Sequence, residues 1–417
     1  MKKLIVSQNK HWKKPYSGLY NREVLQTIIN RLELPQIEAI QGIRRSGKST
    51  IFKLLINHLS KSVDAKEILF LNLDDPFFIP YSNEPTKLHE VIEVAEQITG
   101  KRVKYLFLDE VQSINGWERY VKSVYDNNTF LKIFVTGSNA TFLDTKLTKL
   151  LSGRYFSTKV YPLSFNEILK IVNINSTIEA FENRAKIFSI IDDILKNGSF
   201  VEVFKAKDDL KRDIIKSYYE TIILKDCIYN YSIRDTKGFK ALSYYLISNF
   251  TSPYSYNSLS KAVGVGDMSV KEYISFLEDS FLLYEIKHFS YSLKEQNSSK
   301  KKIYLSDNGF SLLSFNFSAN SGKLLENLVF SELLKRSFKI YFYNKNGIEC
   351  DFIVRKDGAI KAIQVCYELN EKNSKREFNG LKKLPFNCDE KIIITYRQSD
   401  MVEDIKVVPF WEFMVYG

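Results

Sequence analysis

Hydrophobic residues in the first part of the chain form short runs that alternate with segments of helical spacing. Apolar runs at Ile37–Ile40, Glu67–Leu73, Val103–Leu108 and Leu131–Thr136 predict buried strands. After the first run, Ile51–Leu59 carries apolar residues at helical spacing and predicts a helix. Buried strands that alternate with helices predict an α/β domain with a parallel sheet.

Residues 236–310 have a different order of elements. Residues 255–265 and 268–278 predict two helices with a turn at Gly264, and strand-like runs follow on either side of a polar stretch at 296–300. This order resembles a winged helix-turn-helix, in which the second helix enters a DNA groove. The candidate DNA-contacting residues are Ser269, Lys271, Ser275, Lys300, Lys301 and Lys302. Acidic residues around the second helix favour docking of a protein instead, and both alternatives stay open.

Composition narrows the class of protein. A chain of 417 residues with 44% hydrophobic and 14% aromatic residues predicts two or three folded domains. No apolar run has the length of a membrane span or follows a signal-peptide pattern, so we expect a soluble cytoplasmic protein without a membrane partner. The four cysteines are scattered and are expected to be reduced thiols.

The positive charge suits a nucleic-acid partner. The net charge is +11, the pI is about 9.1, and the first fourteen residues carry five lysines and no acidic residue. A generally lysine-rich surface explains the same numbers, because composition does not show whether the charges cluster in space.

The strongest chemical signal is the run from Gly42 to Thr50, which matches G-x-x-x-x-G-K-[ST] between the first strand and its helix. The glycines allow a tight turn around phosphates, Lys48 is expected to reach the β- and γ-phosphates, and Ser49 to ligate Mg²⁺. The candidate nucleotide-binding residues are Gly42, Arg44, Arg45, Ser46, Gly47, Lys48, Ser49 and Thr50.

Two carboxylates follow the strand at 103–108. Asp109 and Glu110 lie where a parallel sheet delivers side chains to its carboxyl edge, beside the phosphates. We expect Asp109 to hold Mg²⁺ together with Ser49, and Glu110 to polarise the attacking water as a catalytic residue.

Further motifs give a family resemblance. Thr136–Asn139, Leu151–Arg154 and Tyr161–Phe165 follow in the order seen in a group of bacterial and archaeal AAA+ ATPases that carry an additional C-terminal module, and the chain resembles that group. The resemblance implies that the nucleotide is ATP and that Ser138 or Asn139 senses the γ-phosphate. It also implies that Arg154 is an arginine finger or a γ-phosphate contact, and a finger acting in trans requires a neighbouring subunit in a homo-oligomer.

The last hundred residues resemble the restriction-endonuclease-like fold. Glu326 on a helix and Asp351 in a strand match two acidic positions of its metal site, whereas Gln364 and Cys366 stand where a carboxylate and a lysine belong. Loss of one carboxylate and of the lysine is expected to cripple hydrolysis unless another lysine such as Lys361 replaces it, so an inactive domain is predicted.

These observations predict five segments and one main activity. The segments are a basic arm (1–20), an AAA+ core (21–165), a helical lid or connector (166–235), a winged helix (236–310) and a nuclease-like domain (311–417). The predicted activity is Mg²⁺-dependent ATP hydrolysis coupled to binding or remodelling of double-stranded DNA. The alternatives are an ATP-dependent switch that docks a protein partner and, third, an ATP-gated nuclease.

Overall fold

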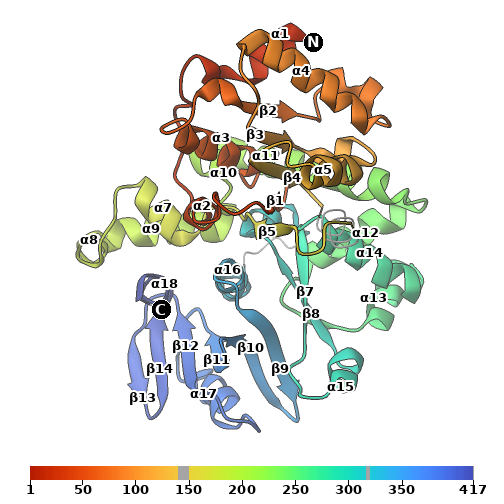
Figure 1. Ribbon diagram of the computed structural model, residues 1–417. Helices are drawn as coiled ribbons and strands as arrows, with labels where there is room; N and C mark the ends of the chain where they lie inside the picture. Colours follow the sequence, from red (N-terminus) through yellow and green to blue (C-terminus); the bar gives the residue numbers. More distant parts are fainter. Residues whose placement is uncertain (140–149, 316–319, 417) are drawn as a thin grey trace. The chain divides into compact units, whose positions relative to one another are not determined.

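The computed structural model describes residues 1–139, 150–315 and 320–416. It divides into two compact units, one of residues 1–161 with 279–281 and one of residues 162–278 with 282–417 (Figure 1). The segments predicted as lid, winged helix and C-terminal domain lie in the second unit, except for residues 279–281 of the winged helix.

The first unit is built on a five-stranded sheet in which every described strand pair is parallel. The strand order is β2 (Ile68–Asn72), β3 (Tyr105–Asp109), β4 (Lys132–Gly137), β1 (Ile37–Gln41) and β5 (Tyr155–Lys159). The four apolar runs thus form the four strands predicted from them. The fifth strand, β5, was not predicted. It lies at the edge of the sheet, and its sequence Tyr-Phe-Ser-Thr-Lys lacks the continuous apolar run that marked the other four strands.

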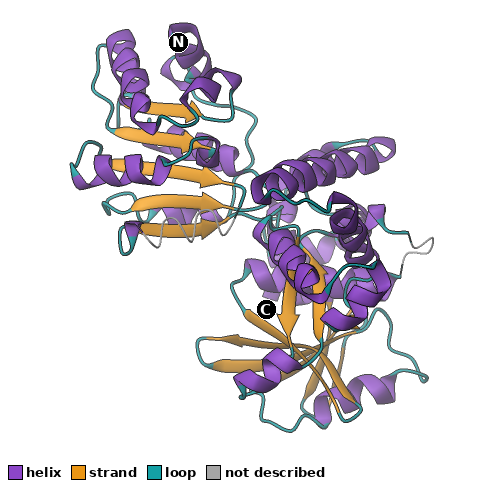
Figure 2. Cartoon of the chain, turned by 90° about the vertical axis from the view of Figure 1, so that its right-hand side faces the viewer, coloured by secondary structure: helices purple, strands orange, loops and turns teal. Residues whose placement is uncertain are grey.

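Helices cover both faces of this sheet (Figure 2). The helices α2 (Val24–Ile29) and α3 (Lys48–Leu59) bury their apolar residues against one face. The other face packs against α1 (Lys2–Gln8), α4 (Leu88–Thr99) and α5 (Trp117–Asp126). Short 3₁₀ turns complete the unit: η1 (Lys10–Trp12), η2 (Ala65–Glu67), η3 (Pro76–Tyr81), η4 (Pro85–Lys87) and η5 (Val111–Ser113).

The amino-terminal segment, predicted as a basic arm, bonds to the sheet through uncharged side chains while its lysines stay exposed. Asn9 exchanges hydrogen bonds with the backbone of Phe70, with Nδ2 3.0 Å from the carbonyl oxygen and Oδ1 2.7 Å from the amide nitrogen. Gln8 does the same with Asn72, and the Trp12 indole donates to Ile68 O at 2.9 Å. These amide side chains bond to the backbone of β2 along its outer edge, since β2 is the first strand in the order of the described sheet.

The second unit begins with helices over the segment predicted to be a helical lid. They are α7 (Phe165–Ile171), α8 (Thr177–Glu182), α9 (Arg184–Asn197), α10 (Val201–Lys205) and α11 (Asp208–Thr221), which continues into the π-helical turn η6 (Ile222–Tyr229). Ser164 caps α7 through the Glu167 amide, and the Glu167 carboxylate accepts from the Ser164 amide in return.

A small antiparallel sheet follows, with order β6 (Pro253–Tyr254), β8 (Lys301–Leu305) and β7 (Leu283–Lys287). The helices nearby are α12 (Thr236–Ser248), α13 (Tyr256–Val263) and α14 (Asp267–Asp279). The last two form the predicted helix pair, and Gly264 ends α13 at φ +70°. The stretch 296–300, expected to be a loop, is partly helical. Residues 296–298 belong to α15 (Leu293–Ser298), whose first turn is capped by Ser292.

The C-terminal part holds a mixed six-stranded sheet (Figure 1). Its order is β13 (Asp400–Val402), β14 (Ile405–Pro409), β12 (Glu390–Thr395), β11 (Ala359–Val365), β10 (Ile348–Lys356) and β9 (Lys339–Lys345). The remaining elements are η7 (Asn308–Leu313), α16 (Ser321–Lys335), α17 (Ser374–Lys382) and α18 (Phe410–Tyr416). Glu326 lies on a helix, and Asp351 and Gln364 lie on adjacent strands, as predicted.

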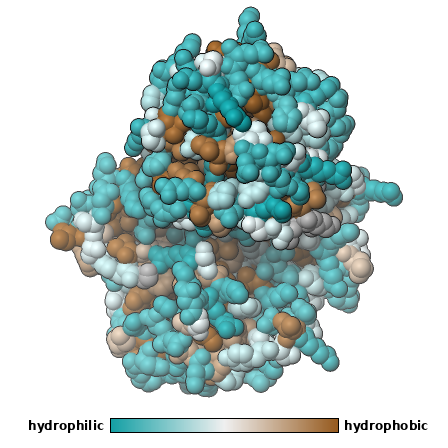
Figure 3. Space-filling model, viewed as in Figure 1, coloured by the Kyte–Doolittle hydropathy of each residue, from teal (hydrophilic) through white to brown (hydrophobic). Residues whose placement is uncertain are grey.

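Hydrophilic residues cover most of the face drawn in Figure 3, with separate hydrophobic groups among them. One such group lies at the tip of α8, where Ile178 and Phe181 are exposed. None of the helices in the described ranges is long and apolar enough to cross a membrane.

Candidate functional site

The loop from Gly42 to Gly47 connects the end of β1 to the start of α3 and has little room for side chains. A Cβ atom on Gly42 would lie 2.0 Å from the carbonyl oxygen of Val160. Gly47 has φ +102° and is the residue before the first turn of α3. Glycine is therefore required at Gly42 by close backbone approach and at Gly47 by its left-handed conformation.

Lys48 is buried and folds back over this loop. Its Nζ donates to Gly42 O at 2.9 Å and to Ile43 O at 3.3 Å, and it lies 3.8 Å from Glu110 Oε1. An ammonium held over a loop of backbone amides and a helix amino terminus is the arrangement that binds phosphate groups.

Asp109 at the end of β3 is the meeting point of three elements. Ser49 Oγ on α3 donates to Asp109 Oδ2 at 2.6 Å, and Thr136 Oγ1 on β4 donates to Oδ1 at 2.5 Å. A hydroxyl and a carboxylate oxygen side by side are the donors that Mg²⁺ takes in nucleotide sites. Ser49 and Asp109 therefore fit the predicted metal, and Thr136 is an additional residue that the sequence analysis did not single out.

Glu110 is held by contacts on both carboxylate oxygens. It has the left-handed backbone conformation, with φ +55°, and its amide donates to Thr136 Oγ1 at 2.9 Å. Lys48 faces Oε1, and Gln112 Nε2 donates to Oε2 and also to Ser138 Oγ at 3.2 Å. Gln112 thus links the predicted catalytic carboxylate to the end of β4, a contact for which the sequence holds no motif.

The two neighbouring carboxyl groups differ in their electrostatics. Burial raises the pKa of Asp109, and the adjacent charge of Glu110 adds to the rise. Burial opposes ionisation of Glu110 as well, but the charges of Lys48 and Arg44 outweigh it and lower the pKa of Glu110. The pKa of Glu110 is therefore shifted in the direction that favours its carboxylate form, which a group that accepts a proton from water needs.

The other predicted nucleotide-binding residues lie in the loop or at the start of α3, and their exposure to solvent differs. Arg45 is exposed, Arg44 and Thr50 are half-buried, and Ser46 is buried. Arg22 was not predicted, yet its buried guanidinium donates to Ser46 O at 2.8 Å and to Tyr161 O at 2.7 Å. It braces the loop from a segment without a motif, so only the fold reveals it.

Ser138 and Asn139, the two alternatives for the predicted sensor, are the buried residues that follow β4. They therefore lie at the carboxyl edge of the sheet, since β4 and β1 are parallel with Gln41 opposite Gly137. Residues 140–149 lie outside the described residues.

Arg154 lies at the other edge of the sheet. Its carbonyl accepts from the Ile37 amide at 2.8 Å, and Tyr155 pairs with Ile37 at the amino ends of β5 and β1. The length of β1 separates it from the loop by about 13 Å, taking ~3.3 Å per residue. The expected γ-phosphate contact within one subunit is therefore wrong. The side chain is 41% exposed and pairs with Asp126, with Nε 3.2 Å from Oδ1.

The predicted DNA-contacting residues differ in their exposure to solvent. On α14, Lys271 and Ser275 are exposed and Ser269 is half-buried, and Lys300 is exposed near α15. Lys301 and Lys302 are buried, which contradicts their assignment to a DNA-binding surface. Lys301 Nζ donates to the carbonyls of Asn297 and Ser299, each at 3.0 Å.

The nuclease-like residues are brought together only in part. Glu326, Asp351 and Gln364 belong to one polar network, while Cys366 packs among apolar residues. Lys361 does not replace the absent lysine, because its Nζ pairs with Glu390 at 2.8 Å.

Comparisons with known proteins agree with the first half of this description. Residues 35–169 match a family described as AAA domain, which supports the predicted ATP-binding AAA+ type of protein. Residues 189–321 and 321–413 match two families described as domains of unknown function (DUF8612 and DUF4143).

Two relatives extend over nearly the whole chain. "Uncharacterized protein MJ1544" of Methanocaldococcus jannaschii is 31% identical over 405 residues, covering 91% of this chain and 88% of the relative. An "Uncharacterized protein" of Haemophilus influenzae is 30% identical over 394 residues, covering 92% and 95%. Among solved structures, AMPPCP-bound DnaA from Aquifex aeolicus is 18% identical with a TM-score of 0.27, covering 61% of this chain and 86% of that one. That score is too low to carry an argument.

Proposed function

We propose that this chain, which belongs to the family of the Methanocaldococcus jannaschii protein MJ1544, is an ATPase that hydrolyses ATP with Mg²⁺ at the carboxyl edge of its AAA sheet. The contact between Ser49 and Asp109, with Lys48 and Glu110 beside it, carries the proposal. Ser49 and Asp109 would hold Mg²⁺, which neutralises charge on the β- and γ-phosphates. Lys48 would leave the loop carbonyls for phosphate oxygens, and Glu110 would orient and deprotonate the attacking water.

Two variants test the roles separately. Lys48→Ala removes the cation that faces the phosphates and is expected to abolish ATP binding, whereas Glu110→Gln keeps binding and loses turnover. Binding is measured with a fluorescent ATP analogue and turnover by phosphate release. Lys61→Ala, an exposed lysine just beyond α3, is the matched control. Wild-type turnover in Glu110→Gln contradicts the proposed role of Glu110.

We propose that Arg154 acts on the ATP site of a neighbouring subunit. Its place at the amino edge, away from its own loop, and its exposed guanidinium support this role. Arginine fingers contribute about 10³ to 10⁵ in kcat in GTPases that use them. Arg154→Ala is therefore expected to bind ATP normally and to hydrolyse it at a much lower rate.

A mixing experiment distinguishes action in trans from a structural role. Lys48→Ala protein has an intact Arg154, and Arg154→Ala protein has an intact ATP site, so mixed oligomers contain complete sites. Recovery of ATPase activity on mixing two inactive proteins is expected. Absence of recovery, under conditions where the two proteins are shown to associate, contradicts action in trans.

The exposed surface of α14 suggests what ATP turnover controls. Met268 is 79% exposed beside Lys271 and Glu272, a mixture of apolar and oppositely charged groups, while two of the six predicted DNA contacts are buried. This composition favours the predicted switch that docks a protein partner over DNA binding. Stimulation of the ATPase by duplex DNA, lost in Lys271→Ala and weakened by salt, supports DNA coupling instead.

A further inference from the structure

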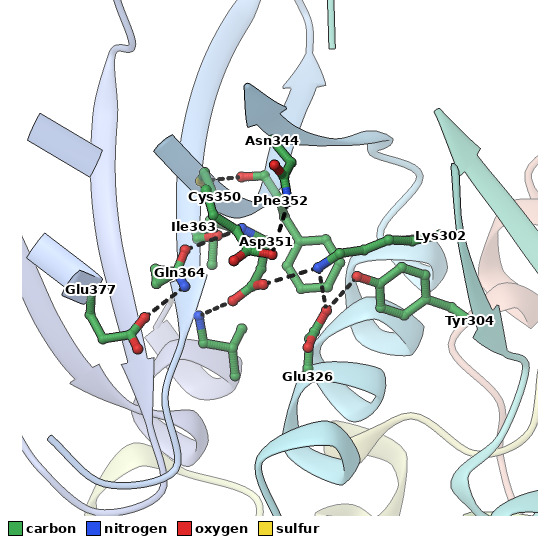
Figure 4. A network of polar contacts seen from close by, with 12 residues as sticks. Lys302, Tyr304, Glu326, Asn344, Cys350, Asp351, Phe352, Ile363, Gln364 and Glu377 are labelled. Atoms are coloured by element: carbon green, nitrogen blue, oxygen red, sulfur yellow. Dashed lines mark hydrogen bonds and ion pairs between the residues drawn. The ribbon is translucent and has the colours of Figure 1, made fainter. Parts of the chain in front are cut away.

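A lysine from the small three-stranded sheet lies between the two acidic residues of the nuclease-like site. Lys302 on β8 directs its ammonium toward Glu326 on α16 and Asp351 on β10 (Figure 4). Its Nζ lies 3.2 Å from Glu326 Oε1 and 3.2 Å from Asp351 Oδ1. The lysine side chain is 3% exposed, and the side chains of Glu326 and Asp351 are 13% and 9% exposed, so the ammonium is buried between two largely buried acids.

Polar groups of the protein occupy the neighbouring positions too. Tyr304, two residues along β8, donates its hydroxyl to Glu326 Oε1 at 2.6 Å. The amide of Val365 donates to Asp351 Oδ2 at 3.0 Å, and Gln364 Oε1 accepts from the Asp351 amide at 3.1 Å. The donor set expected for a divalent cation is thus bonded within the protein (Figure 4).

We propose that the ammonium of Lys302 takes the place that a divalent cation has in a metal-dependent nuclease, so this site is an ion cluster without metal. Within the described ranges, no group of three or more His, Cys, Asp or Glu side chains is arranged to hold a metal ion. The cluster ties β8 to α16 and β10, two elements of the C-terminal part. The proposal is independent of ATP hydrolysis.

The charges explain why the lysine stays ionised in a buried position. Burial disfavours the ammonium, but the carboxylates of Glu326 and Asp351 outweigh it and raise the pKa of Lys302. Burial also raises the pKa of Glu326, to about 7, against the opposing effect of Lys302. The positive charge of Lys302 thus compensates the charges of two carboxylates. A divalent cation would bind here only against repulsion by the ammonium, or after the ammonium has been displaced.

A role of Lys302 as the relocated nuclease lysine is the competing explanation. That role needs a metal ion beside the lysine, held by the same two acids. The bonding of Asp351 and the neutral amide of Gln364, which donates to Glu377 at 2.7 Å, disfavours it. The two explanations differ in whether the unmodified protein binds a divalent cation here.

Mn²⁺ binding by the nucleotide-free, full-length protein tests the proposal. Electron paramagnetic resonance titration is expected to give the same number of bound Mn²⁺ ions for wild type and Asp351→Asn. Lys302→Met is expected to lower the Tm by about 10 °C, because it leaves two buried acids without their cation. It is also expected to gain one bound Mn²⁺, which restores most of the lost Tm.

Control variants separate this result from a general effect. Lys301→Met removes a lysine that donates to two backbone carbonyls and lies over the Tyr256 ring, and it is expected to gain no Mn²⁺. Lys302→Met combined with Asp351→Asn is expected to lose the gained ion. A Mn²⁺ ion in the wild type that Asp351→Asn removes, or DNA cleavage with Mn²⁺ that Asp351→Asn abolishes, overturns the proposal. The wild-type comparison decides this even if Lys302→Met does not fold.

Discussion

Gly42→Ala is expected to destroy the ATP site while the rest of the AAA domain stays folded. The added Cβ would lie 2.0 Å from Val160 O, whereas carbon and oxygen atoms without a covalent bond stay about 3.3 Å apart. The backbone at Gly42 and the carbonyl of Val160 must therefore move apart by about 1.3 Å to restore this ordinary contact distance. Gly42 O also accepts from Lys48 Nζ at 2.9 Å, so the displacement moves the group that faces the phosphates.

The expected loss is large because phosphate sites depend on fixed geometry. A misplacement of about 1 Å costs on the order of 10² in rate, and the loop amides lose affinity as well. We expect ATP affinity to fall at least about 30-fold and turnover at least about 100-fold, with the circular dichroism spectrum unchanged.

Gly100→Ala is the matched control for this experiment. Gly100 also has a positive φ, +66°, but a Cβ there meets nothing within 4 Å. The control therefore carries the conformational cost of about 1 to 2 kcal/mol without the clash, and it is expected to keep ATP binding. If Gly42→Ala binds ATP within about threefold of the wild type, the close approach to Val160 does not constrain the loop.

Three further variants test other contacts. Thr136→Val removes the hydroxyl that bonds Asp109 and the Glu110 amide; we expect a Tm lower by several degrees and a higher KM for Mg²⁺-ATP, and an unchanged Tm contradicts this. Gln112→Ala releases the Glu110 carboxylate, so kcat is expected to fall about 10-fold while ATP affinity stays within about twofold; weaker binding instead assigns Gln112 to the nucleotide. Burial lowers the pKa of His11 to about 4, so the unfolded state binds the proton first as pH falls below about 6.5. Stability at pH 5 is then about 2 kcal/mol lower than at pH 7, and urea unfolding of His11→Gln should lack most of this difference.

Prediction from sequence worked where the signal is local. The strands at 37–40, 67–73, 103–108 and 131–136 are continuous apolar runs, and a run buried on both faces needs no knowledge of its neighbours. Asp109 is an equally local case, because a polar residue that ends such a run must lie at the carboxyl edge of the sheet.

Prediction failed where a side chain bonds to a segment that is distant in the sequence. No contact was predicted for Gln8, Asn9 and Trp12, which bond to the outer edge of β2 about sixty residues away. Lys302 was assigned to DNA from its position in a basic run, and its ammonium instead faces Glu326 and Asp351. The charge of a run does not show which of its members point inward.

The sequence by itself predicted the phosphate-binding loop, the two carboxylates that follow the third apolar run and the positions of four core strands along the chain. These depend on backbone conformation and on hydrophobic periodicity, which short segments encode. Only the tertiary structure decided that Thr136, Gln112 and Arg22 surround the site, that Arg154 lies at the far edge, and that Lys302 fills the acidic site. Each of these is a contact between residues brought together by strand order and burial, and no local pattern records which partner a polar side chain meets.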